Sequence, residues 1–363
     1  MIFDVLDHHV IYENPEPSFY SRQAYFPGIV RLPSDELVAL FRIAQAFESP
    51  DGRTFVSRSS DGGHTWTLQG RLHLRERRGL VTMKPTLLDD GTLIAVGYGF
   101  YQSDSGRWIN KDAGGLPAGE NLVSVSRDGG CNWTRPRALR LKYPEVLEVS
   151  GPCLQLRCGD LIALGTPMPR YDGSTPSGHV GVALRSSDRG RSWRDDVIYY
   201  DNPPIGPYEA RLCQLQDDRI VAILWALDVS SGTCHANQVV VSHDNGFTWS
   251  APIDTGIAAQ ASNVTALGHR LLSIHAHRES EPVGVFVRLA DLRTEKWHTV
   301  AEACLWGRAP ARTVSGFQDM GSNLRFGQPS IVEVGRHEYL GYHWSIEEGQ
   351  GRILAHRFRV NPQ

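Results

Sequence analysis

The stretch Ser59-Ser60-Asp61-Gly62-Gly63-His64-Thr65-Trp66 follows the pattern S-x-D-x-G-x-T-W, and this pattern returns along the chain. Three further copies, spaced about 55–70 residues apart, occupy residues 126–133, 186–193 and 242–249. A fifth, degenerate copy keeps only Asp291 and Trp297. A period of this length predicts a fold built from repeated supersecondary units.

The chemistry of this pattern is local. An Asp carboxylate accepts backbone N–H bonds, and Gly adopts the positive φ that a tight turn requires. The Trp supplies an apolar anchor that packs beneath a neighbouring strand. A calcium loop would need more oxygen ligands than the single aspartate provides. We therefore interpret each copy as a structural turn.

A second repeated element precedes each turn and consists of two short strands, with a small residue in the middle of the second. Six copies align, and their small residues are Ala39, Ala95, Ala163, Ala222, Ser273 and Gly341. Such a column fits inner strands that crowd around a common axis. We predict one domain over residues 1–363, an all-β six-bladed β-propeller. The strand near 353–360 should pair with residues 3–12 and close the ring.

The composition of the chain limits its partners. Its 363 residues carry a formal net charge of −3, without the basic excess typical of nucleic-acid binding. The first residues lack a signal-peptide pattern, and no apolar run reaches membrane-spanning length. The six cysteines form no C-x-x-C pair, which favours reduced thiols. We expect a cytoplasmic protein with no metal or other cofactor and with neither nucleic acid nor membrane as partner; its oligomeric state stays open.

The four turns resemble the Asp-boxes, or BNR repeats, of the sialidase superfamily, and this resemblance covers nearly the whole chain. Sialidases carry the motif N-E-x-x-V-x-E-L-x-D-G, which residues 208–218 resemble, and the resemblance places Glu209 on the family's Glu. Tyr25 and Trp225 stand where that family has two of its substrate arginines, and Gln328 stands at its Tyr nucleophile. The resemblance implies the propeller fold with chemistry other than sialidase chemistry.

Residues at the starts of the inner strands should point toward the axis of the ring. This predicted axial ring consists of Tyr25, Lys84, Ser150, Glu209, Ser262 and Gln328. Glu209 is the predicted acid/base residue, because a partly buried carboxylate suits proton transfer; an ion pair with Arg211 is the structural alternative. Lys84 would hold an anionic group or assist the leaving oxygen, and His277 is a candidate base.

The remaining candidates are residues expected to contact substrate. They are Tyr25, Arg42, Tyr208, Arg211, Trp225, His275, Gln328 and His343. Aromatic side chains with a few polar groups suit a sugar, whose ring faces are apolar. The histidines could also ligate a metal, although satisfied histidines at strand ends are the commoner case.

A glycosidase needs a second carboxylate, and the sequence does not choose among several. The candidates are Glu48, Asp51, Asp104, Glu148 and Asp319. Our leading hypothesis is a glycoside hydrolase acting on a small, possibly anionic sugar. A lyase or epimerase acting on a uronate-like sugar, and a non-catalytic carbohydrate-binding propeller, are the two alternatives. An unsaturated product that absorbs ultraviolet light would distinguish elimination from hydrolysis.

Overall fold

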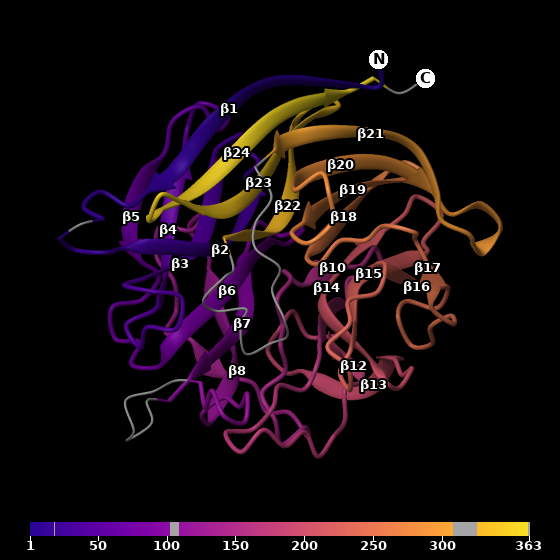
Figure 1. The fold of residues 1–363 in the computed structure, drawn as a ribbon. Helices are drawn as coiled ribbons and strands as arrows, with labels where there is room; N and C mark the ends of the chain where they lie inside the picture. The colour runs from indigo at the N-terminus through magenta and orange to yellow at the C-terminus, as the bar shows by residue number, and fades with distance from the viewer. Residues whose placement is uncertain (18, 102–108, 308–324, 362–363) are drawn as a thin grey trace.

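The computed structural model describes residues 1–17, 19–101, 109–307 and 325–361, which form six four-stranded sheets arranged in a ring (Figure 1). This architecture confirms the predicted six-bladed β-propeller. The strands of blades one to three are β2 (Gln23–Arg31), β3 (Leu37–Ala44), β4 (Arg53–Ser59), β5 (Thr67–Arg71), β6 (Gly79–Leu87), β7 (Leu93–Phe100), β8 (Gly119–Ser126), β9 (Arg137–Ala138), β10 (Leu154–Gln155), β11 (Leu161–Gly165), β12 (Gly181–Ser186) and β13 (Arg194–Tyr200).

Blades four to six follow the same meander, in which each strand pairs antiparallel with the next. Their strands are β14 (Ile205–Gln214), β15 (Ile220–Asp228), β16 (Gln238–Ser242), β17 (Ile253–Asp254), β18 (Ser262–Leu267), β19 (Arg270–His277), β20 (Gly284–Asp291), β21 (His298–Gly307), β22 (Phe326–Gly335), β23 (Glu338–Glu347), β24 (Gln350–Val360) and β1 (Phe3–Glu13). A short 3-10 helix, η1 (Arg293–Glu295), connects β20 to β21. Among the described residues, no helix has the length and apolar character needed to cross a bilayer.

The two ends of the chain close the ring. β1 pairs antiparallel with β24, from Phe3 opposite Val360 to Glu13 opposite Arg352. The termini therefore lie side by side, and the first strand of the chain is the outermost strand of the last blade (Figure 1). This pairing confirms the predicted closure and leaves blade six without a missing strand.

Each S-x-D-x-G-x-T-W turn connects the third and fourth strands of its blade. In the first copy, Ser59 Oγ donates to Asp61 Oδ1 at 2.7 Å, and Asp61 accepts from Thr65 N at 2.9 Å and Thr65 Oγ1 at 2.6 Å. Trp66 Nε1 donates to the Gly63 carbonyl at 3.0 Å. The same bonds recur in the other three copies. The aspartate is thus engaged within its own turn, which supports the structural interpretation.

The small-residue column is fully enclosed, with exposed fractions of 0% at its alanines and at Ser273. At Gly341, an added Cβ would lie 2.6 Å from Leu305 and 3.0 Å from Ile274, both in the neighbouring blade. The expectation that this column faces a crowded central axis is therefore wrong at Gly341. The small residue there instead allows two blades to pack closely against each other.

Candidate active site

A β-bulge interrupts the inner strand of four blades among the described residues. The pairing shifts within β2, β6, β14 and β22, so each of these strands gains an extra residue. At each bulge a residue other than glycine takes a positive φ, namely 57° at Phe26, 51° at Leu80, 48° at Glu209 and 43° at Gln328. Such a bulge turns a side chain out of the regular alternation and aims it elsewhere.

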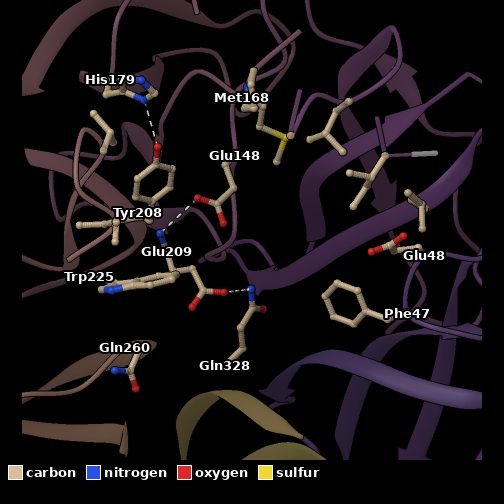
Figure 2. Close-up of a pocket in the computed structure, with 18 of the residues that line it drawn as sticks. Phe47, Glu48, Glu148, Met168, His179, Tyr208, Glu209, Trp225, Gln260 and Gln328 are labelled. Atoms are coloured by element: carbon tan, nitrogen blue, oxygen red, sulfur yellow. Dashed lines mark hydrogen bonds between the residues drawn. The ribbon is translucent and has the colours of Figure 1, made fainter. Parts of the chain in front are cut away.

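These bulge residues all line one pocket of about 550 Å³. Glu148, which precedes β10, and Gln260, which precedes β18, complete a ring with one residue from each blade (Figure 2). The observed ring is Phe26, Leu80, Glu148, Glu209, Gln260 and Gln328. It shares Glu209 and Gln328 with the predicted axial ring. The other four predicted positions lie one to four residues away from the observed ones. In blades one and two the bulges account for the difference, and in blades three and five the pocket residue precedes the inner strand.

Glu209 lines this pocket with most of its side chain buried. Its Oε1 accepts a hydrogen bond of 2.6 Å from Gln328 Nε2, while Oε2 has no hydrogen-bond partner among the described residues. The guanidinium of Arg278 lies 3.9 Å from Oε2, and only 11% of the Glu209 side chain is exposed. A donor and a nearby cation stabilise negative charge on this carboxylate.

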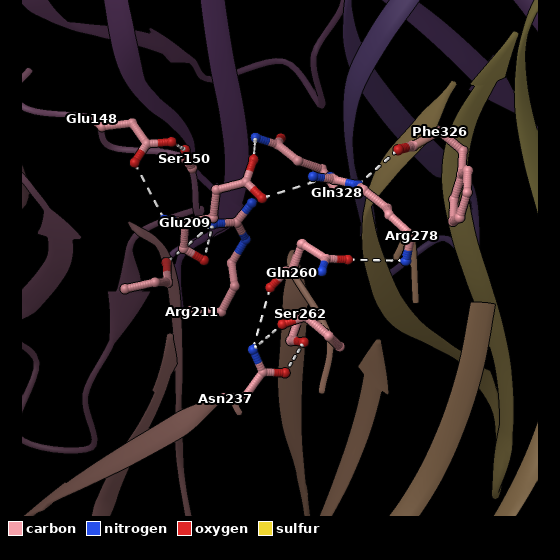
Figure 3. Close-up of polar contacts among 12 residues, drawn as sticks. Glu148, Ser150, Glu209, Arg211, Asn237, Gln260, Ser262, Arg278, Phe326 and Gln328 are labelled. Atoms are coloured by element: carbon pink, nitrogen blue, oxygen red, sulfur yellow. Dashed lines mark hydrogen bonds and ion pairs between the residues drawn. The ribbon is translucent and has the colours of Figure 1, made fainter. Parts of the chain in front are cut away.

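Arg211 lies behind Glu209 rather than in the pocket. It is buried, and its NH1 donates to the carbonyl oxygens of Glu209 at 3.0 Å and Ala210 at 3.1 Å (Figure 3). These bonds hold the backbone of the bulge. The geometry therefore gives Arg211 a positioning role and offers no direct route to substrate.

Glu148 lies beside Glu209 in a different electrostatic environment. Its Oε1 accepts from Ser150 Oγ at 2.6 Å, and its Oε2 accepts from the backbone N–H of Glu209 at 3.2 Å (Figure 3). Burial, reinforced by the charge of Glu209, raises the pKa of Glu148 to about 7. Glu148 therefore holds a proton for much of the time near neutral pH, which suits a general acid.

Arg42 lines the opposite side of the pocket within a cage of aromatic rings. Its guanidinium carbon lies 5.2 Å from the ring centre of Tyr25, 4.6 Å from that of Phe26 and 5.2 Å from that of Phe47. Its NH2 donates to the Phe47 carbonyl at 2.9 Å, but its buried Nε has no hydrogen-bond partner in the described part of the chain. Tyr25 belongs to this cage but is buried and does not line the pocket.

Tyr208 and Trp225 form a third wall (Figure 2). Their ring centres are 6.1 Å apart, and the Tyr208 hydroxyl is 3.0 Å from Nδ1 of His179. Burial lowers the pKa of His179, so this imidazole is neutral near pH 7. His179 was not among the predicted site residues, although it directly follows a long loop of the kind that forms sites.

Lys84 supports the pocket without lining it. It is 2% exposed, and its Nζ donates to the Pro27 carbonyl at 2.7 Å and to Gln328 Oε1 at 3.1 Å. Since Gln328 in turn donates to Glu209, Lys84 orients the amide that orients the carboxylate. Burial holds the pKa of Lys84 well below its ordinary value. Direct contact with substrate, as predicted for Lys84, has no support in this geometry.

The three candidate histidines lie outside the residues that line the pocket. His275 is buried against Ser262 and Ser273, at 2.9 and 2.8 Å. His277 lies 3.2 Å from the guanidinium of Arg288, and His343 lies 3.0 Å from another imidazole. Burial lowers the pKa of His277 and of His343 to about 4. These histidines are neutral packing groups in this geometry, which gives no support to their predicted roles as base or substrate contacts.

The five candidates for the second carboxylate differ in whether they line the pocket. Glu148 and Glu48 line the pocket, and Glu48 is 4.0 Å from Lys111. Asp51 instead accepts from the backbone N–H of Gln45. The other two candidates, Asp104 and Asp319, lie outside the described residues. Only Glu148 among them hydrogen-bonds to the backbone of Glu209 in the described part of the chain.

Arg278 and Gln260 complete the polar part of the pocket. Gln260 Oε1 accepts from the backbone N–H of Arg278 at 2.9 Å, and the Arg278 Nε donates to the Phe326 carbonyl at 3.0 Å (Figure 3). These bonds fix the guanidinium beside Glu209. Gln260 precedes its strand in a stretch without any distinctive pattern, so no sequence signal pointed to it.

No family model and no curated protein sequence matches the chain. Several solved structures nevertheless superpose on it. A protein of unknown function from Dyadobacter fermentans matches with a TM-score of 0.76 and 20% identity over 99% of this chain and 100% of its own. The NanB sialidase from Streptococcus pneumoniae matches with a TM-score of 0.62 and 11% identity, over 97% of this chain and 70% of its own.

An α-L-arabinanase from Penicillium chrysogenum, solved with arabinobiose, matches with a TM-score of 0.65 and 13% identity over 98% of both chains. At such low identities the similarity establishes the fold and leaves the reaction to the site. The chain therefore has the six-bladed fold of the sialidase-like propeller superfamily.

Proposed function

We propose that this protein is a carbohydrate-active enzyme, a glycoside hydrolase that cleaves a small sugar derivative. The observation that carries the proposal is the carboxylate pair at the centre of the pocket. Burial lets Glu148 hold a proton for much of the time near neutral pH, whereas Glu209 faces a donated N–H and a guanidinium. Two carboxyl groups in contrasting environments are the arrangement that glycosidic bond cleavage uses.

In this proposal Glu148 is the general acid and protonates the departing glycosidic oxygen. The carboxylate of Glu209, which lines the pocket, either attacks the anomeric carbon or removes a proton from an attacking water. The separation of the two carboxyl groups around bound substrate decides between these routes. Arg278 stabilises the charge on Glu209 as the reaction begins, and Lys84 acts only through Gln328.

The walls of the pocket suit a sugar with an acidic group. Trp225 and Tyr208 offer apolar faces for the faces of a sugar ring. Across the pocket, the guanidinium of Arg42 supplies the positive charge that would attract a carboxylate on the substrate. The sialidases and the arabinanase with similar folds act on glycosides, which makes hydrolysis the reaction to test first.

The test compares wild type with Glu148→Gln and Glu209→Gln on 4-nitrophenyl and alkyl glycosides, neutral and uronic. A 4-nitrophenolate leaves without protonation, so Glu148→Gln should retain far more activity on the aryl glycosides than on the alkyl ones. Glu209→Gln should lose both activities by at least about 100-fold, the lower end of typical acid–base contributions. Glu48→Gln is the matched control, because it removes a carboxylate from the same pocket. If both Gln variants match wild type on every cleaved glycoside, the proposal is wrong.

A second candidate is elimination from a uronate-like sugar, favoured by the Tyr208–His179 hydrogen bond inside the pocket. There the neutral imidazole would accept a proton relayed through the Tyr208 hydroxyl. A uronate oligosaccharide would then give an unsaturated product with ultraviolet absorbance, and Tyr208→Phe would abolish it. Binding of sugars without any turnover by wild type would instead support a non-catalytic propeller.

A further inference from the structure

The closing strand β1 presents chemically different residues on its two sides. Asp7 and His9 are two residues apart and therefore point to the same side of the strand. His8, between them, points to the other side, where its Nδ1 is 2.8 Å from an imidazole nitrogen of His356. The side with Asp7 and His9 meets His64, which belongs to the first repeat turn of blade one.

Asp7, His9 and His64 bring three potential ligand atoms together. One such atom from each residue lies within 4.8 Å of the other two. Asp7 Oδ1 and His9 Nε2 are 2.8 Å apart, and the rings of His9 and His64 lie nearly perpendicular with centres 4.8 Å apart. Both atoms are shielded from solvent, and apart from this mutual contact neither has a hydrogen-bond partner among the described residues. A shielded carboxylate oxygen and imidazole nitrogen with so few contacts can bind a further group.

One cation already lies near this cluster. The Nε of Arg357 is 3.6 Å from Asp7 Oδ1. The same guanidinium also contacts a Glu338 carboxylate oxygen at 2.6 Å and the Gly62 carbonyl at 2.5 Å. Arg357 is therefore shared among several acceptors, and Asp7 Oδ1 also lies beside the two histidines.

We propose that Asp7, His9 and His64 form a Zn²⁺ site that joins the closing strand to blade one. Two imidazole nitrogens and one carboxylate oxygen are ligands that Zn²⁺ prefers, and a water molecule would complete a tetrahedral site. Ca²⁺ and Mg²⁺ fit less well, because both ions favour oxygen ligands. The site lies outside the pocket and plays no part in the proposed reaction.

The position of His64 explains what such a site would do. The equivalent residues in the other three repeat turns are Cys131, Arg191 and Phe247. Among the four described repeat turns, the first one contacts β1 through its histidine, which thus reaches from blade one to the last blade. A metal bound between them would link the N-terminal strand to the neighbouring blade and stabilise ring closure, since binding to the folded state alone raises stability.

The experiment uses the full chain without a purification tag, stripped of metal with a chelator and titrated calorimetrically with ZnCl₂. Wild type should bind one Zn²⁺, and Co²⁺ should give the visible absorption of a tetrahedral site. His9→Gln and His64→Gln should each weaken Zn²⁺ binding by more than about 100-fold, because losing a residue that only supports a ligand already costs about 10–100-fold. His243→Gln is the matched control, since His243 is an exposed histidine of the fourth repeat turn.

Thermal unfolding supplies a second readout that does not depend on calorimetry. Zn²⁺ should raise the Tm of wild type and His243→Gln, and it should leave the Tm of His64→Gln unchanged. Because His64 is exposed, its replacement should leave the metal-free protein folded. Absence of stoichiometric Zn²⁺ binding to wild type overturns the proposal. Equal Zn²⁺ affinity of wild type, His9→Gln and His64→Gln also overturns it, because the metal would then bind elsewhere.

Discussion

Replacing Glu148 by Gln should make the protein more stable than wild type at alkaline pH and equally stable at acid pH. Burial and the neighbouring charge of Glu209 raise the pKa of Glu148 from 4.5 to about 7 in the folded protein. Below the pKa that Glu148 has in the unfolded chain, the folded and unfolded states both carry its proton, so folding is not penalised. As pH rises toward 7 the unfolded chain loses this proton first, and the stability contributed by the neutral form is lost.

The size of this effect follows from the pKa difference. Each pKa unit corresponds to about 1.4 kcal/mol, so the rise from 4.5 to about 7 corresponds to about 3 kcal/mol. With an unfolding entropy of about 2.1 cal/mol/K per residue, this energy shifts the Tm of a chain of 363 residues by about 4 °C. The new amide can keep both hydrogen bonds, because its oxygen can accept from the Glu209 N–H and Ser150 Oγ can accept from its NH₂.

Scanning calorimetry between pH 4.5 and 8.5 measures this difference directly. The Tm of Glu148→Gln minus that of wild type should be near zero at pH 4.5, rise up to pH 7 and then level off. In a Glu209→Gln background the rise should be smaller, because one of the two causes of the high pKa is removed. Parallel Tm curves for wild type and Glu148→Gln across this range would refute the reasoning, since Glu148 would then titrate alike in both states.

Three further predictions concern other parts of the molecule. Gly97→Ala should destabilise the fold by at least about 3 kcal/mol or prevent folding, because its Cβ would lie 1.8 Å from the Thr82 carbonyl oxygen; soluble yield and Tm measure this. Asp61→Asn should lower the free energy of unfolding by about 1–2 kcal/mol at pH 7, because it weakens the bonds from Thr65. Those bonds lower the pKa of Asp61, so the difference in unfolding free energy should shrink below pH 3.8. Arg42→Met should raise the KM of an anionic sugar by about 10–100-fold and leave that of a neutral sugar nearly unchanged, as steady-state kinetics would show.

The fold could be predicted from sequence because its determinants are local and repeated. Each repeat turn is held by bonds within eight residues, as in Asp61 with Thr65, so each copy carries its own signal. Closure by the two termini was also predictable, because a ring of antiparallel blades needs a partner for its last strand. The six copies of the two-strand element predicted the number of blades, and closure by the termini predicted the pairing of β1 with β24.

The site was only partly predictable, because it depends on contacts between blades. Glu209 was found from the pattern that opens its strand, but its partner Glu148 lies 61 residues earlier and remained one of five candidates. The positions of the bulges could not be predicted from the sequence either, because Phe and Gln, found at positions 26 and 328, do not normally adopt a positive φ. Side-chain alternation placed His275 near the axis. In the structure the imidazole of His275 is instead buried against Ser273 and does not face the pocket.

The bulges also explain how one propeller can change its chemistry and keep its fold. A bulge turns its residue out of the regular alternation of the strand, so the side chain can reach the pocket. Phe26, Leu80, Glu209 and Gln328 occupy this position in four blades, and two of them are apolar and two polar. The backbone strain at Glu209 is offset by buried bonds from Arg211 to the carbonyl oxygens of Glu209 and Ala210. Substitution at the four bulge positions therefore alters the pocket lining directly, whereas substitution at Arg211 should disturb Glu209 without touching substrate.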